Sequence, residues 1–371
     1  MIQMAKRLEK VDLSDIRKMF EEVGENDINL GIGEPDFNIP ENVMKSIIHG
    51  LNEGFTHYTS NMGCIELREE ISKKLKKDNS LNFDSKSIMV TTGASEALYI
   101  ASQSLFNKND EVLIPDPGFL SYKASIELAE AKPIPIKTSF ENDYKMKYED
   151  VYDKINSKTK GIILNSPSNP TGAVMDKEDI KAICDLSIDH DFIIISDEIY
   201  EKIIYNGKHY SPAKFSENTL LINGFSKAYA MTGLRIGYIA GQSNIIDEIL
   251  KVHQYNTACV SSLSQIGAYE ALKNSNKYVE NLVKEFRRRK NLILTGLDDL
   301  GLKYNNVQGA FYVFPKIENA NDYVKKALKA GVVLVPGKNF GESCENNIRI
   351  SYATSYENLK EAINRLKTIN L

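Results

Sequence analysis

Lys227 is the residue whose surroundings in the sequence point most directly to covalent chemistry. It lies in the segment Asn223–Ala228, after an apolar run and among small and apolar residues. Such neighbours remove part of the solvation of an amine, which lowers its pKa and makes it a candidate Schiff-base nucleophile. Arg235 follows eight residues later, past a turn at Met231–Gly233, and could reach a phosphate. A solvated lysine is the commoner alternative, so Lys227 alone decides nothing.

Three further polar segments follow apolar runs of the sequence. Gly93–Ala97 opens a helical pattern with small residues, which leaves N–H groups free to bind an anion, although a plain tight turn is the commoner explanation. Asp197 ends another run, where a carboxylate needs a cationic or hydrogen-bonded partner, or else caps a helix. Ser166–Gly172 has ordinary turn chemistry, and its interest lies in its position at the end of a third run.

The combination of these segments is more specific than any one of them. An aldehyde cofactor with a pyridine ring and a phosphate needs a lysine for the aldehyde and a carboxylate for the ring nitrogen. It also needs cations and N–H groups for the phosphate. In open α/β sheets, ligands bind beyond the carboxyl ends of the strands. Because these groups follow successive candidate strands, we expect them to meet at one edge of a sheet.

Apolar runs alternate with helical patterns through the first two thirds of the chain. Several runs are continuous in Val, Ile and Leu, as expected for strands buried on both faces. The expected strands are Ser87–Thr92, Glu111–Pro115, Pro133–Lys137, Gly161–Asn165, Phe192–Ser196, Thr219–Ile222 and Arg235–Ala240. The helical patterns between them include Ala94–Phe106, Phe119–Ala131 and Lys177–His190. This alternation predicts an α/β fold with a mostly parallel seven-stranded sheet.

A smaller α+β unit is expected after Gly241. A helical stretch covers about Leu263–Asp298, with a break near Asn274–Asn276. The elements expected after it are strands at Phe311–Phe314, Val332–Val335 and Asn347–Ser351 and helices at Asp322–Ala330 and Tyr356–Lys367. The segment before about Pro40 is too short to fold alone and is expected to dock on the small domain or a partner subunit. The predicted division is an N-terminal arm with part of the small domain (1–43), a large domain (44–278) and a small domain (279–371).

The composition is that of an ordinary globular protein and argues against several classes of function. The net charge of −4 and the pI near 5.9 disfavour a nucleic-acid partner. No apolar run approaches the roughly 18 residues that a membrane span needs. The four cysteines are far apart and lack the spacing of a zinc site. With no secretory signal in the sequence, reduced thiols in a cytoplasmic protein without a bound metal are expected.

Over essentially its full length the chain resembles the class I aminotransferases of pyridoxal 5'-phosphate (PLP) fold type I, and most closely the archaeal and prokaryotic aspartate and aromatic aminotransferases. The order and spacing of the matching segments agree with the family as well as their residues do. These segments are GEPDF (Gly33–Phe37), HYTSNMG (His57–Gly63), GASEAL (Gly93–Leu98), SPSNPTGAV (Ser166–Val174), SDEIY (Ser196–Tyr200), NGFSKAYAMTGLRIGY (Asn223–Tyr238) and IRISYAT (Ile348–Thr354).

The resemblance implies a role for each matching residue around the cofactor ring. Lys227 is expected to form the internal aldimine and then to move a proton between the substrate Cα and the cofactor. Asp197 would pair with the pyridinium nitrogen and keep the ring protonated. Tyr200 and Asn169 would bind the ring hydroxyl oxygen, and Phe119 would stack on the ring.

The resemblance also implies which residues bind the phosphate and the substrate. The expected phosphate ligands are Ala94, Ser95, Ser226 and Arg235. Arg349 would hold the substrate α-carboxylate with a two-pronged hydrogen bond, and Gly33 would line the same site. Tyr58 matches a tyrosine that reaches the phosphate of the neighbouring subunit, which implies a homodimer with a shared active site.

Three positions depart from the patterns of some relatives. Leu234 precedes Arg235 where many relatives have tryptophan, a change that concerns packing. Ser95 stands where some aspartate-specific relatives have a lysine for the distal carboxylate of the substrate, and Ile16 where some have a polar residue nearby. These changes predict a less cationic side-chain pocket, so aspartate or an aromatic amino acid could be the donor, with 2-oxoglutarate as the common acceptor.

Two other functions are compatible with the same resemblance. A β-lyase acting on cysteine conjugates could use the same scaffold, because one fold hosts many chemistries. A PLP-binding regulatory module would need a DNA-binding domain, for which the sequence offers neither a helix-turn-helix pattern nor a basic patch. A nicotinamide site at Gly31–Gly33 is disfavoured, since the third glycine of that motif is missing and Pro35 would break the required helix.

Overall fold

A sheet of seven strands, in the order β2-β8-β7-β6-β5-β3-β4, forms the centre of the larger part of the molecule in the computed structural model, which describes residues 4–11, 24 and 26–369. Strand β8 is antiparallel to both of its neighbours, and the other strands run in one direction. The strands are β2 (Ile88–Thr91), β3 (Glu111–Asp116), β4 (Lys132–Lys137), β5 (Thr159–Asn165), β6 (Ile193–Asp197), β7 (Thr219–Gly224) and β8 (Gly237–Ala240). The predicted mostly parallel seven-stranded sheet is confirmed.

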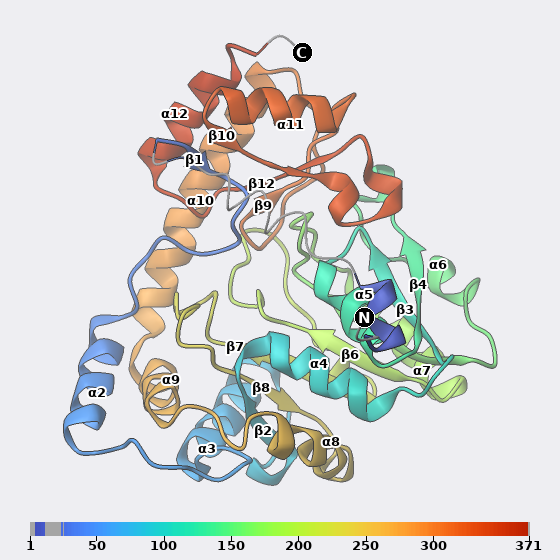
Figure 1. Ribbon diagram of the computed structural model, residues 1–371, viewed down its shortest axis with the longest axis vertical. Coiled ribbons are helices and arrows are strands. Elements are labelled where there is room, and N and C mark those ends of the chain that lie inside the picture. Colours follow the sequence, from blue (N-terminus) through green and yellow to red (C-terminus); the bar gives the residue numbers. More distant parts are fainter. Residues whose placement is uncertain (1–3, 12–23, 25, 370–371) are drawn as a thin grey trace.

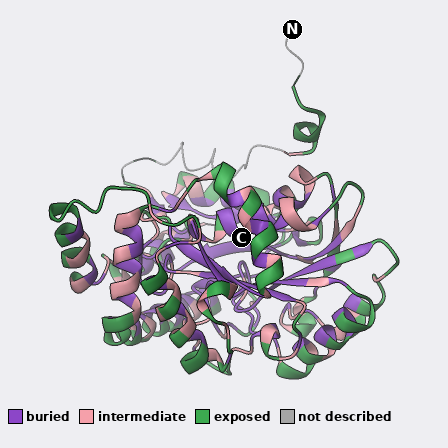
Figure 2. Cartoon of the chain, turned by 90° about the horizontal axis from the view of Figure 1, so that it is seen from below, coloured by how far each residue is buried: buried purple, intermediate pink, exposed green. Residues whose placement is uncertain are grey.

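Helices cover both faces of this sheet because side chains alternate along each strand. Ile163 and Ile195 pack with one group of helices, whereas Ile162 and Ile194 pack on the opposite face. The first group is α4 (Gly93–Leu105), α5 (Leu120–Leu128) and α8 (Ser243–Asn256). The opposite face carries α2 (Glu41–Asn52), α3 (Ile65–Lys74), α6 (Tyr148–Tyr152), α7 (Lys177–Asp189) and α9 (Ser262–Asn274). Figure 2 shows the buried strands between these more exposed layers.

The second unit lies above the carboxyl ends of the parallel strands (Figure 1). Helix α10 (Asn276–Asp299) extends from the large sheet into it and packs on α12 (Tyr356–Leu366). Strands β11 (Val335–Pro336), β12 (Ile348–Ser351) and β9 (Tyr312–Val313) form an antiparallel sheet beside α11 (Ala320–Lys329). The expected helix break near Asn274–Asn276 is confirmed.

Three details differ from the expectations. The strand expected at Val332–Val335 is split, because Val332–Val333 (β10) pairs with β1 while β11 pairs with β12. Arg235 has a φ of 50°, so it precedes β8 instead of starting it. Helix α8 was not anticipated, since the expected helical stretch began only at Leu263.

The N-terminal segment docks on the second unit through β1 (Ile28–Asn29), which lies parallel to β10. This confirms one of the two expected docking sites for that segment. A short 3₁₀ helix at Lys6–Lys10 contacts α5. The predicted boundary at 278/279 falls within the first turn of α10, and the domain division stays a prediction. Within the described part of the chain, no helix is both long and apolar enough to cross a membrane.

Candidate active site

A cavity of about 830 Å³ lies between the carboxyl ends of the large sheet and the second unit. Eleven of the residues predicted from the sequence line it. They are Gly33, Ala94, Ser95, Phe119, Asn169, Asp197, Tyr200, Ser226, Lys227, Arg235 and Arg349. Tyr58 does not line this cavity, and its side chain is 90 % exposed. Ile16 lies outside the described residues.

Lys227 reaches the cavity from the segment that follows β7. Its Nζ donates a hydrogen bond to the carbonyl oxygen of Gly33 at 2.7 Å. Burial lowers the pKa of this amine to about 8, and the positive charges of Arg349 and Arg235 act in the same direction against Glu34. More of this amine is therefore neutral at pH 7 than of an ordinary lysine, although the protonated form still predominates. The neutral form is the one that attacks carbonyl carbons and accepts protons.

Asp197 ends β6 and is buried on the cavity side of that strand. Its carboxylate accepts hydrogen bonds from Tyr122 Oη at 2.7 Å and from the amide of Ile199 at 3.2 Å. Both of these donors are neutral, and burial raises the pKa of Asp197 to about 6. A cationic group of a ligand beside this carboxylate would favour its ionised form.

Tyr200 and Gly33 meet at Tyr312 of β9. The two phenol oxygens, Tyr200 Oη and Tyr312 Oη, are 2.8 Å apart. A Cβ atom added to Gly33 would lie 2.1 Å from Tyr312 Oη, so only glycine permits this close approach. The glycine therefore fixes how near the N-terminal segment comes to the cavity.

The first turn of α4 and Arg235 form a cradle suited to an anion. Gly93 starts the helix with a φ of 75°, and the side chain of the N-cap residue, Thr92, makes no capping hydrogen bond. A Cβ on Gly93 would lie 2.8 Å from Arg235 Nη2, so the guanidinium lies directly over this turn. Arg235 is held there by a 2.9 Å hydrogen bond to the Thr232 carbonyl. Free N–H groups, a helix N-terminus and a guanidinium are what a phosphate requires.

Arg349 lies on β12 and is buried without a carboxylate partner among the described residues. Its Nη1 donates to Asn169 Oδ1 at 3.0 Å and its Nη2 donates to the carbonyl oxygen of Gly31. The rings of Tyr312 and Phe340 each lie 4.7 Å from the guanidinium carbon. Burial lowers the pKa of Arg349, so a bound carboxylate would relieve a desolvated cation.

Several residues of the site were missed from the sequence. Tyr122 lies inside α5, the helix that follows β3, and its contact with Asp197 of β6 joins elements that are distant in the sequence. Tyr312 and Phe340 come from the second unit. Asn165 could have been found, because it ends β5 and binds the Asp197 carbonyl at 3.0 Å.

The lining of the cavity is mixed in character. Ser95, Leu98 and Phe119 contribute small and apolar groups to it. Lys10 and Lys123 also line the cavity, and neither was considered from the sequence. These two lysines add cationic side chains that the departure at Ser95 does not predict.

Comparisons with known proteins show the family to which the chain is similar. The model described as "Aminotransferase class I and II" matches residues 25–366. A probable aspartate aminotransferase of Methanocaldococcus jannaschii is 46 % identical and covers 99 % of both chains. Aromatic-amino-acid aminotransferase 2 of Thermococcus litoralis is 39 % identical over 99 % of this chain and 98 % of its own. The solved aromatic aminotransferase of Pyrococcus horikoshii superposes with a TM-score of 0.90 at 41 % identity, covering 95 % of this chain and 98 % of its own.

Proposed function

Because this chain belongs to the class I and II aminotransferases, we propose that it transfers the amino group of aspartate or an aromatic L-amino acid to 2-oxoglutarate, with Lys227 holding its PLP cofactor. The family is PLP-dependent. Both half-reactions would use one cavity in turn, a ping-pong scheme. The observation that carries the proposal is the convergence of Lys227, Asp197 and the Arg235 cradle on that cavity.

The residues of the cavity fit this cofactor on two separate grounds. The Gly93 turn with Arg235 suits the phosphate, since the N-terminus of α4 and the guanidinium both supply hydrogen-bond donors, while the Glu96 carboxylate of the same turn accepts from the Thr92 amide. Asp197 suits the ring nitrogen, because a buried carboxylate with neutral donors favours a cation beside it. When bound, PLP supplies a protonated ring that accepts electrons from the substrate carbon.

Lys227 would perform the proton transfer that transamination requires. A reversible shift of one proton between two carbons needs a single base within reach of both. The pKa of about 8 brings the exchange of its proton closer to neutral pH than in an ordinary lysine. The Gly33 carbonyl holds Nζ in the cavity until a ligand takes its place.

Arg349 would bind the α-carboxylate of the substrate. Its two Nη atoms point to neutral oxygens of Asn169 and Gly31, which a carboxylate with two oxygens can replace in the same geometry. The rings of Tyr312 and Phe340 both contact the guanidinium and help to hold it in place. The α-carbon of the substrate would then lie in the same cavity as Lys227.

A homodimer with shared active sites is part of the proposal. Helix α2 and the segment after it expose an apolar stripe, Met44, Ile48, Leu51 and Phe55, which continues toward Tyr58. Large exposed apolar patches commonly mark interfaces between proteins. The expected result in analytical ultracentrifugation is a dimer, and an active monomer would contradict this part.

The absorbance of purified protein incubated with PLP tests the proposal. The absorbance band of bound PLP should bleach when an amino donor is added and return with 2-oxoglutarate. The extent of bleaching with aspartate and with tyrosine, added separately, would show which of the two is the better donor. Release of pyruvate and ammonia from cystathionine without a 2-oxo acid would instead support a β-lyase. Protein that takes up PLP but is active with none of these substrates would support a binding module.

A cytoplasmic location remains a prediction. The cysteines at 64, 184, 259 and 344 are all free in the structure, as the sequence suggested. Free thiols are typical of reducing compartments. Fractionation of cells that express a tagged copy would test the location.

A further inference from the structure

Glu198 lies between two residues of the proposed machinery, yet that machinery gives it no role. Asp197 before it projects to the α5 side of the sheet, where Tyr122 donates to it. The side chain of Glu198 lies on the other face, with Ser196, because neighbouring residues of a strand alternate. Asp197 and Glu198 are therefore adjacent in the backbone, but their carboxylates lie on opposite faces of the sheet in different surroundings.

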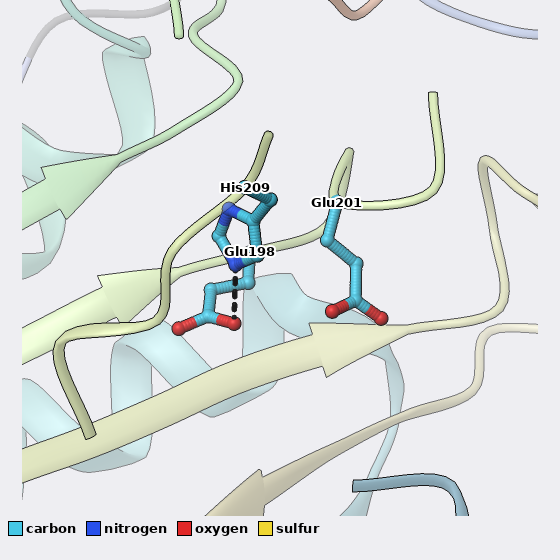
Figure 3. A group of neighbouring side chains, drawn as sticks. All are labelled: Glu198, Glu201 and His209. Carbon is cyan, nitrogen blue, oxygen red and sulfur yellow. Dashed lines mark hydrogen bonds and ion pairs between the residues drawn. The ribbon is translucent and has the colours of Figure 1, made fainter. Parts of the chain in front are cut away.

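The Glu198 carboxylate is almost completely buried and accepts three side-chain hydrogen bonds. Ser196 Oγ donates at 3.0 Å and Ser211 Oγ at 2.6 Å, both to Oε1. His209 Nε2 lies 2.8 Å from Oε2 (Figure 3). A buried carboxylate needs such partners, and a cationic imidazole is the strongest of them.

The charges around His209 favour its protonated form. Burial acts to lower the pKa of His209, but Glu198 and then Glu201 raise it further than burial and Lys74 lower it, so the pKa is raised overall. Glu201, the third side chain of Figure 3, is bound by Lys74 and by Asn79 Nδ2 at 2.6 Å. These groups form a closed ion cluster in which Lys74 and His209 balance the two carboxylates.

We propose that Glu198 and His209 are positioning residues that hold Asp197 against the ring nitrogen of the cofactor. The inference rests on the proposed function, since it needs Asp197 to face that nitrogen. The Glu198 amide donates to the Ile222 carbonyl at 2.8 Å, and the Asp197 carbonyl accepts from Asn165. Adjacent Cα atoms are about 3.8 Å apart, so a displaced Glu198 would move Asp197 directly.

Replacement of His209 by alanine would leave the Glu198 charge buried without its cationic partner. We expect kcat to fall about tenfold, the effect typical of losing the outer partner of a site residue. The KM for the amino acid should stay unchanged, because Arg349 is held from other elements. The ¹⁵N chemical shift of the PLP ring nitrogen should move toward its unprotonated value.

His209→Gln restores a neutral donor to Glu198 and should recover part of kcat and of the ¹⁵N shift. Glu198→Gln removes the carboxylate while keeping its volume, and should change kcat and the ¹⁵N shift in the same direction as His209→Ala. The Glu198→Gln variant tests the positioning role even if His209→Ala does not fold. His190→Ala is the matched control, because His190 is exposed at the end of α7.

Two results would overturn the inference while leaving the proposed function standing. One is His209→Ala and Glu198→Gln with unchanged kcat and ¹⁵N shift in an enzyme whose wild type transaminates. The other is a lower melting temperature as the sole change, which would mean a purely structural pair. A wild type that binds no PLP would refute the function and this inference together.

Discussion

Asp197 and Arg349 are both buried charged groups of the same cavity, but their partners differ in origin. Asp197 is held by Tyr122 and Ile199, which come from the large sheet and its covering helix, as Asp197 does. Arg349 of the second unit binds Asn169, in the loop that follows β5 of the large sheet, and Gly31 of the N-terminal segment. We call Asp197 and Lys227 the floor of the cavity and Arg349 its rim. The carboxylate of Asp197 is held within one unit, Lys227 bonds to Gly33 of the N-terminal segment, and Arg349 joins three parts of the chain.

This difference matches two tasks, proton transfer on the floor and substrate binding at the rim. Groups on the floor have their pKa values shifted by burial, to about 6 for Asp197 and about 8 for Lys227, which suits proton transfer. The hydrogen bonds of Arg349 go to the neutral oxygens of Asn169 and Gly31, which a substrate carboxylate can replace. Changes to the floor should therefore affect kcat and cofactor binding, and changes to the rim should affect KM.

Lys227→Ala should produce the largest effect. Turnover should fall by at least about 10³-fold, since a positioned proton-transfer group contributes about 10²–10⁴-fold and the covalent attachment is lost as well. PLP could still bind through the phosphate cradle. Steady-state rates and a PLP titration measure both quantities, with exposed Lys108→Ala as the control. Turnover near that of the wild type would remove Lys227 from the mechanism.

Asp197→Asn tests how much the ionised, buried Asp197 lowers the stability of the cofactor-free protein. An acid with a raised folded pKa binds its proton more tightly when folded, so wild-type stability should fall as pH rises from 3.8 to about 6. The free energy of unfolding of the wild type relative to the variant should drop by about 3 kcal/mol across this window, at about 1.4 kcal/mol per pKa unit. Urea unfolding of cofactor-free protein at pH 4 and pH 7 measures this, and a pH-independent difference would contradict the shift.

Arg349→Lys tests the rim. Lysine cannot make the two-pronged hydrogen bond, so KM for the amino acid should rise about 10- to 100-fold, corresponding to about 1.5–3 kcal/mol, while kcat changes little. Arg288→Lys, at a largely exposed site, is the matched control. A selective fall in kcat would mean that Arg349 belongs with the floor.

Asp116→Asn should give the smallest effect. Asp116 of β3 is buried at the joint with the second unit, where it accepts from Ser343 Oγ at 2.9 Å. Burial raises its pKa, and Ser343 and Lys137 oppose part of that rise. Wild-type stability should again fall relative to the variant as pH rises above 3.8, by less than at Asp197. A stability difference of the opposite sign would exclude burial as the cause.

The groups at strand ends were predictable from the sequence, whereas contacts between distant elements were not. Lys227, Asp197 and Gly93 each follow an apolar run, so strand periodicity placed them at one edge of the sheet. Tyr122 and Phe340 reach the cavity only through helix and unit packing, for which the sequence holds no local signal. The split between β10 and β11 likewise depends on pairing with two different partners.

Reduction of the PLP-loaded protein with borohydride, followed by peptide mass spectrometry, tests the central claim most directly. The reduction fixes the bond between the cofactor and the amine that carries it. The account predicts a pyridoxyl adduct on the peptide that contains Lys227 and its absence from the Lys227→Ala variant. An adduct on another lysine, or no adduct in an active enzyme, would contradict it.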